Sequence, residues 1–68
     1  MSQADIINYF ILTNNKPSKK TEIMKRLKGN SQQSIDRSLN KMGEIEALLS
    51  GSYERLYKLK DRYYEMLK

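Results

Sequence analysis

The chain has 68 residues and a formal net charge of +5, and it contains no Cys, His or Trp. A chain of this length is expected to form a single domain over residues 1–68. Without Cys or His, it has no side chain for a disulfide, for a thiolate or imidazole metal site, or for an imidazole general base. We therefore expect neither a metal nor a cofactor.

No segment of the sequence is typical of a membrane protein. The longest apolar stretch, Ile6–Leu12, is interrupted by Asn8 and is much shorter than the roughly 20 residues that span a bilayer. Residues 1–5 lack the basic segment of a signal peptide. We expect a cytoplasmic protein with no membrane partner, either nucleoid-associated or encoded by a virus or plasmid.

The positive charge is concentrated in one segment. Residues 16–28 contain six Lys or Arg side chains against the single carboxylate of Glu22, which equals the net charge of the whole chain. Such a segment indicates a surface that faces a polyanion, although a solvated lysine-rich helix would have the same composition.

Apolar residues at helical spacing predict the first two helices. Ile6 and Phe10 belong to a pattern that predicts a helix over about residues 3–13, and Asn14 and Asn15 end it. Ser18 is a favourable N-cap residue for a second helix over about residues 19–28.

The third helix has two distinct faces. Gly29-Asn30 is expected to end the second helix, because both residues tolerate the left-handed conformation. Ser31 is expected to cap a helix over about residues 32–42, whose buried face carries Ile35, Leu39 and Met42. The opposite face carries Gln33, Arg37 and Asn40, with Asp36 and Lys41 beside them.

The C-terminal part has two interpretations. Alternating residues on both sides of Gly51-Ser52 predict a β-hairpin over about residues 44–60, and Asp61 can begin a short helix over about 61–68. Heptad spacing offers an all-helical alternative for residues 31–68, with a seam made of Leu56, Leu59, Tyr63 and Met66.

The order helix, helix, turn, helix, hairpin resembles the winged helix-turn-helix family of DNA-binding domains. The stretches Thr21–Leu27 and Ser31–Leu39 resemble its supporting and recognition helices. The resemblance implies a mainly α fold with a small β-hairpin: three helices, a wing over about residues 44–60 and a short C-terminal helix. The helix-turn-helix would occupy about residues 19–42.

The residue types are suited to DNA. A Gln side chain can pair with adenine and an Arg side chain with guanine in the major groove, which suggests base-reading roles for Gln33 and Arg37. Short polar residues at a helix N-terminus and lysines around it can hold phosphates. The expected DNA contacts are Lys19, Lys20, Lys28, Ser31, Gln32, Gln33, Ser34, Arg37, Asn40, Lys41, Ser52 and Arg55. The Asp36 carboxylate would be repelled by phosphate. It could orient Arg37 or Lys41, accept a hydrogen bond from a cytosine amine, or be a plain surface charge.

The five Tyr residues could stack on single-stranded bases, but their spacing favours packing. Tyr57 alternates toward the core side of the hairpin. Tyr63, Tyr64 and Leu67 are expected to form a homodimer contact.

Catalysis is not expected. The sequence has no P-loop and no G-x-G-x-x-G loop, and its Ser residues have no His partner. Glu44 and Glu46 lie two residues apart beside the solvent-facing hairpin, and so small a chain has little room for a substrate pocket.

The sequence therefore predicts sequence-specific binding of double-stranded DNA by a small transcriptional regulator. Repression by occluding a promoter is the simplest mechanism, with a homodimer on a two-fold related site. One alternative is a low-specificity architectural or replication-associated DNA-binding protein. Another is an all-helical protein-interaction module.

Overall fold

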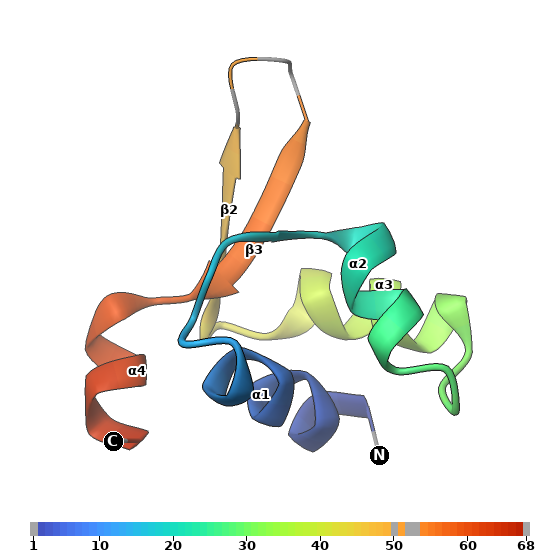
Figure 1. Cartoon of the computed structure of the whole chain (residues 1–68), viewed down its shortest axis with the longest axis horizontal. Helices are drawn as coiled ribbons and strands as arrows, with labels where there is room; N and C mark the ends of the chain where they lie inside the picture. The colour runs from blue at the N-terminus through green and yellow to red at the C-terminus, as the bar shows by residue number, and fades with distance from the viewer. Residues whose placement is uncertain (1, 50, 52–53, 68) are drawn as a thin grey trace.

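The computed structural model describes residues 2–49, 51 and 54–67 of the chain. These residues form four helices and a three-stranded antiparallel sheet, in the order α1 (Ser2–Leu12), β1 (Ser18–Lys19), α2 (Lys20–Arg26), α3 (Gln32–Lys41), β2 (Ile45–Leu49), β3 (Arg55–Leu59) and α4 (Asp61–Leu67) (Figure 1). The expected order of helices and hairpin is confirmed, and the strand β1 is an addition to it.

Helix α1 ends where the sequence indicates. Its residues Ile6 and Phe10 are fully buried. Asn14 and Asn15 both have φ 57°, a left-handed conformation in which Asn is enriched. The backbone amide of Asn15 donates to the Phe10 carbonyl at 2.6 Å. The reversal at Asn14–Asn15 therefore closes the helix and returns the chain toward the sheet.

The connector before α2 differs from the expectation. Ser18 does not cap α2; it lies in β1, where its hydroxyl accepts from the Tyr9 hydroxyl at 2.8 Å and donates to the Lys16 carbonyl at 3.0 Å. Lys19 is the N-cap residue, and its amide donates to Glu22 Oε1 at 3.0 Å. The sequence did not indicate β1, because two residues carry no alternation pattern.

The turn between α2 and α3 also differs from the expectation. Neither Gly29 nor Asn30 is left-handed. Helix α2 ends earlier, at Arg26, and the Asn30 side chain donates to Asp5 of α1 at 3.2 Å. Asn30 therefore ties the turn to α1 instead of terminating α2. The cap of α3 is as expected, because Ser31 Oγ accepts from the Ser34 amide at 3.1 Å.

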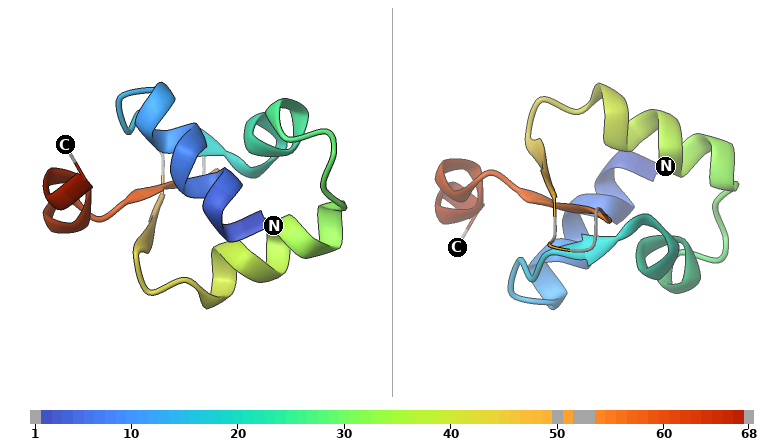
Figure 2. Two further views of the ribbon diagram at one scale, coloured as in Figure 1. Left: turned by 90° about the horizontal axis from the view of Figure 1, so that it is seen from below. Right: turned by 90° about the horizontal axis from the view of Figure 1, so that it is seen from above.

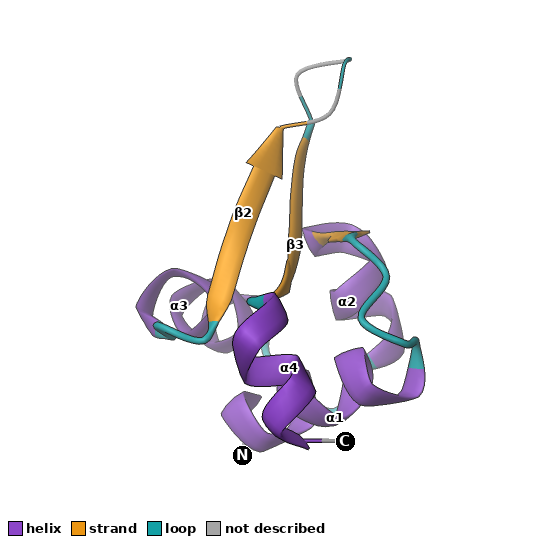
Figure 3. Cartoon of the chain, turned by 90° about the vertical axis from the view of Figure 1, so that its left-hand side faces the viewer, coloured by secondary structure: helices purple, strands orange, loops and turns teal. Residues whose placement is uncertain are grey.

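The sheet has the strand order β1-β3-β2, and both pairings are antiparallel. In β2 and β3 the register runs from Ile45↔Leu59 to Leu49↔Arg55, so the all-helical alternative for residues 31–68 is wrong. In β1, Ser18 lies opposite Tyr57. The described parts of the hairpin project beyond the helices (Figures 1 and 3).

A side-chain amide continues the sheet past β1. Asn15 Nδ2 donates to the Leu59 carbonyl at 2.9 Å, and the Leu59 amide donates to Asn15 Oδ1 at 2.8 Å. Asn15 thus pairs with β3 as a strand residue would. It fixes the end of α1 to the base of the hairpin.

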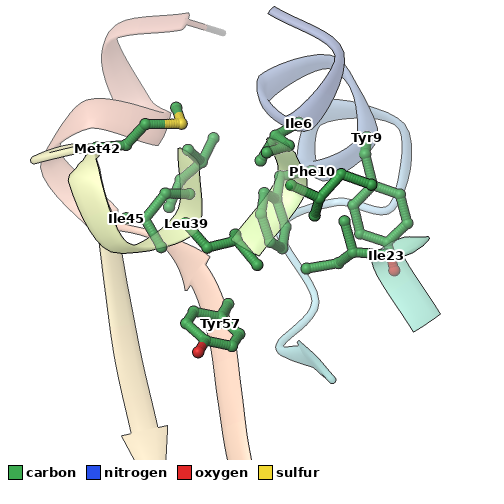
Figure 4. Close-up of a cluster of buried hydrophobic side chains, with 10 residues drawn as sticks. Ile6, Tyr9, Phe10, Ile23, Leu39, Met42, Ile45 and Tyr57 are labelled. Atoms are coloured by element: carbon green, nitrogen blue, oxygen red, sulfur yellow. The ribbon is translucent and has the colours of Figure 1, made fainter. Parts of the chain in front are cut away.

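One hydrophobic core joins the helices to the base of the hairpin (Figure 4). Its fully buried members are Phe10, Ile6, Ile23, Ile35 and Leu59. The predicted stripe on α3 is buried, and Tyr57 is 4% exposed, as the alternation indicated. Because Ile35 and Leu39 hold one side of α3 in the core, its opposite side faces outward.

Helix α4 lies at the opposite end of the molecule from α2 (Figure 2). It contains no buried residue, although Tyr63 and Tyr64 are half-buried and pack against the core. Among the described residues, no helix is long and apolar enough to cross a membrane.

Candidate nucleic-acid interface

The outward face of α3 carries the residues predicted to read bases. Gln33, Arg37 and Asn40 are all exposed, while Ile35, Ser38 and Leu39 on the other side of the helix are buried. Residues four positions apart on a helix lie one above the other, so Gln33 aligns with Arg37 and Asp36 aligns with Asn40. The result is a polar surface of two parallel rows.

The N-terminus of α3 is open to solvent. Ser31 and Gln32 are exposed, and Ser34 is half-buried. The Ser31 oxygen accepts from the Ser34 amide, and a hydroxyl that accepts a bond still has its own proton to donate. The cap therefore leaves Ser31 able to donate to an anion at this end of the helix.

A groove of about 690 Å³ runs between α1 and α3. Arg37 and Lys41 are its charged residues, and the described residues that line it include no carboxylate. Its polar lining is completed by Gln3, Ser31, Gln33, Ser34 and Ser38. Such a lining favours an anionic partner, and it shares Gln33 and Arg37 with the exposed face of α3.

A second groove, of about 510 Å³, lies between α2 and α3. It is lined by Lys25 and Lys28 from the α2 side and by Ser31 and Gln32 from the α3 side, again with no described carboxylate. Lys25 was not among the expected DNA contacts; it lines this groove from α2, and Lys28 lines it from the turn that follows α2. Both flanks of α3 are therefore cationic.

Two of the expected phosphate-binding lysines are already paired with carboxylates. Lys19 Nζ lies 2.6 Å from Glu54 Oε2, and Lys20 Nζ forms an ion pair with Asp36 Oδ1. The hydrogen bond that Lys19 donates to the Glu54 carboxylate raises the pKa of Lys19 above its ordinary value of 10.5, and the hydrogen bond that Lys20 donates to the Asp36 carboxylate does the same for the pKa of Lys20. Both lysines are thus fully charged near neutral pH.

Neither ion pair was predicted from the sequence. The partner of Asp36 is Lys20, not Arg37 or Lys41. These pairs join residues that only tertiary packing brings together, so no local sequence spacing could predict them.

The remaining predicted contacts are placed as follows. Lys28, Asn40, Lys41 and Arg55 are all exposed. Arg55 lies close enough to Lys20 to act on it electrostatically, so it belongs to the same side of the molecule as the Lys20–Asp36 pair. Ser52 lies outside the described residues.

The three residues expected at a dimer contact are not equally available. Tyr63 and Tyr64 already pack against the core of their own chain. Leu67 is 40% exposed, and its neighbour Met66 is 76% exposed. An apolar edge of α4 therefore remains uncovered in the single chain.

No protein-family model, curated protein or solved structure matches this chain.

Proposed function

We propose that this protein binds double-stranded DNA sequence-specifically, as a winged helix-turn-helix domain that inserts α3 into the major groove. The observation that carries the proposal is the exposed Gln33–Arg37–Asn40 face, flanked on both sides by cationic grooves without described carboxylates. The element order and the hairpin after α3 support the winged-helix assignment.

The residues of the proposed interface have two roles, base recognition and phosphate contact. The major groove of B-DNA admits an α-helix, and its base edges present a distinct pattern of donors and acceptors for each base pair. Gln33 pairs with adenine and Arg37 with guanine, both bidentately. The lysines of the α2–α3 groove and Lys41 contact phosphates and fix the position of α3 on the duplex.

We further propose that the protein acts as a transcriptional repressor by occluding a promoter. One α3 helix reads only a few base pairs, so a homodimer on a two-fold related site would supply the specificity that a regulator needs. The uncovered apolar edge of α4, with Met66 and Leu67, supports a role for this helix in the dimer contact.

Selection of bound duplexes from a random pool tests the proposal. We expect an enriched sequence, arranged as a palindrome if the protein binds as a dimer. The affinity should fall steeply with salt, with a slope of about −0.9 per phosphate neutralised. Failure to bind any duplex at low salt would refute the proposal.

The role of α3 has its own test. Arg37→Ala should lose about tenfold or more in affinity for the selected sequence and lose the base preference at one position. Arg26→Ala is the matched control, because it removes the same charge from an exposed site beside α1, outside both grooves of the proposed interface. An Arg37→Ala protein that still distinguishes the selected site from random DNA would contradict the assignment.

The lysine-bearing α2–α3 groove favours a second candidate, an architectural or replication-associated protein with little sequence preference. In that case the phosphate contacts would dominate. Binding to the selected site and to random DNA, measured at one salt concentration, separates the two functions.

A further inference from the structure

Asp36 is an unusual residue for the centre of a DNA-reading surface. It lies on α3 one turn before Asn40 and beside the Gln33–Arg37 row. A lone carboxylate there would be repelled by the phosphates on both sides of the major groove. The ion pair with Lys20 removes that difficulty, because it neutralises the carboxylate without covering it.

The geometry of the pair leaves part of Asp36 available. Its side chain is 44% exposed, whereas Oδ1, the atom that faces Lys20, is shielded from solvent. The exposed area therefore belongs to the remainder of the side chain. Lys20 is 40% exposed, and an ammonium group has three protons to donate, so Lys20 can hold Asp36 and contact a phosphate simultaneously.

We propose that Asp36 is a specificity-determining residue that accepts a hydrogen bond from the N4 amine of a cytosine, and that Lys20 is the positioning residue that orients it. This inference rests on the proposed function. In the major groove a carboxylate can accept from the N4 amine of cytosine or the N6 amine of adenine, but the N7 acceptor beside adenine N6 repels it, as do N7 and O6 of guanine and O4 of thymine. Asp36 would therefore both favour cytosine and disfavour other bases at its position.

A change of base preference is the test. Duplexes are selected from one random pool with the wild-type protein and with Asp36→Asn and Asp36→Ala. Because an Asn side chain pairs with N6 and N7 of adenine, Asp36→Asn should convert one cytosine position of the site to adenine. Asp36→Ala should lose the preference at that position only. Reversing the C·G pair there should weaken wild-type binding about tenfold and leave Asp36→Ala binding unchanged.

The positioning role of Lys20 is tested separately. Lys20→Ala should weaken the cytosine preference and reduce the salt slope by about 0.9. Lys20→Arg should restore both, because it keeps a cation opposite Asp36. Glu54→Gln is the matched control: it removes the carboxylate of the Lys19 ion pair, which lies off α3, and should leave every base preference unchanged.

The outcomes distinguish the two proposals. If the wild-type protein selects no sequence, the proposed function itself fails. If the wild type selects a site and both folded Asp36 variants select the identical site, sequence-specific binding stands and the role of Asp36 is refuted. Circular dichroism of each variant establishes that it is folded.

Discussion

Replacing Asn15 tests how the hairpin is held against the helices. Asn15 is 8% exposed, and its carboxamide makes both hydrogen bonds to the backbone of Leu59. Asn15→Ala would leave the Leu59 amide and carbonyl without these partners in a buried position. Each such loss costs about 1–3 kcal/mol of the free energy of unfolding.

The backbone adds a smaller penalty. Asn15 has φ 57°, and Ala in the left-handed region costs about 1 kcal/mol more than a residue that tolerates it. The expected total for Asn15→Ala is about 3–7 kcal/mol. At about 0.05–0.15 kcal/mol per residue, the whole chain is stable by only about 3–10 kcal/mol. This one substitution should therefore remove much or all of the stability.

Urea denaturation followed by circular dichroism measures the effect. Asn14→Ala is the matched control, because Asn14 has the same φ of 57° but is exposed; it should cost only about 1 kcal/mol. Asn15→Gly keeps the backbone unstrained and should be about 1 kcal/mol less harmful than Asn15→Ala. If Asn15→Ala and Asn14→Ala proved equally stable, the Leu59 hydrogen bonds would not hold the hairpin as described.

Two further predictions concern the charged residues. Lys25→Ala combined with Lys28→Ala should lower the magnitude of the salt slope of DNA binding by up to about 1.8, since each phosphate contact contributes about 0.9; an unchanged slope would remove the α2–α3 groove from the interface. The pKa values of Lys19 and Lys20 are raised above 10.5 in the folded protein. Their ion pairs therefore stabilise the fold fully below pH 10.5, and this contribution is lost as the pH rises through the raised pKa values of the folded state. Between pH 10.5 and 12, the urea midpoint of the wild type should therefore fall more steeply than that of a Lys19→Gln, Lys20→Gln double variant; parallel profiles would show that the pairs contribute nothing measurable.

The helices and the hairpin could be predicted because their apolar residues repeat locally. The period of α3 separates Ile35 and Leu39 from Gln33 and Arg37, so both its buried side and its exposed face follow from the sequence. The β2–β3 alternation placed Tyr57 in the core. These features need only neighbouring residues to be recognised.

Apart from the two ends of α2, the features that the sequence did not predict depend on contacts between distant parts of the chain. β1 is too short to show a period, and the Asn15–Leu59 bonds join residues far apart in the chain. The Lys20–Asp36 and Lys19–Glu54 pairs depend on how α2, α3 and the hairpin pack together. Local pattern can indicate which residues are polar and exposed, but not which charged partner each one meets.

The strand β1 has a consequence for the order in which the chain folds. The β2–β3 hairpin pairs segments that are close in sequence, whereas the Ser18–Tyr57 pairing encloses α2, α3 and β2 in a single loop. The entropy of closing that loop must be offset before the β1 contacts are gained. The hairpin can therefore form early as a local unit, while its angle to the helices is set by some of the last and most distant contacts that the chain makes.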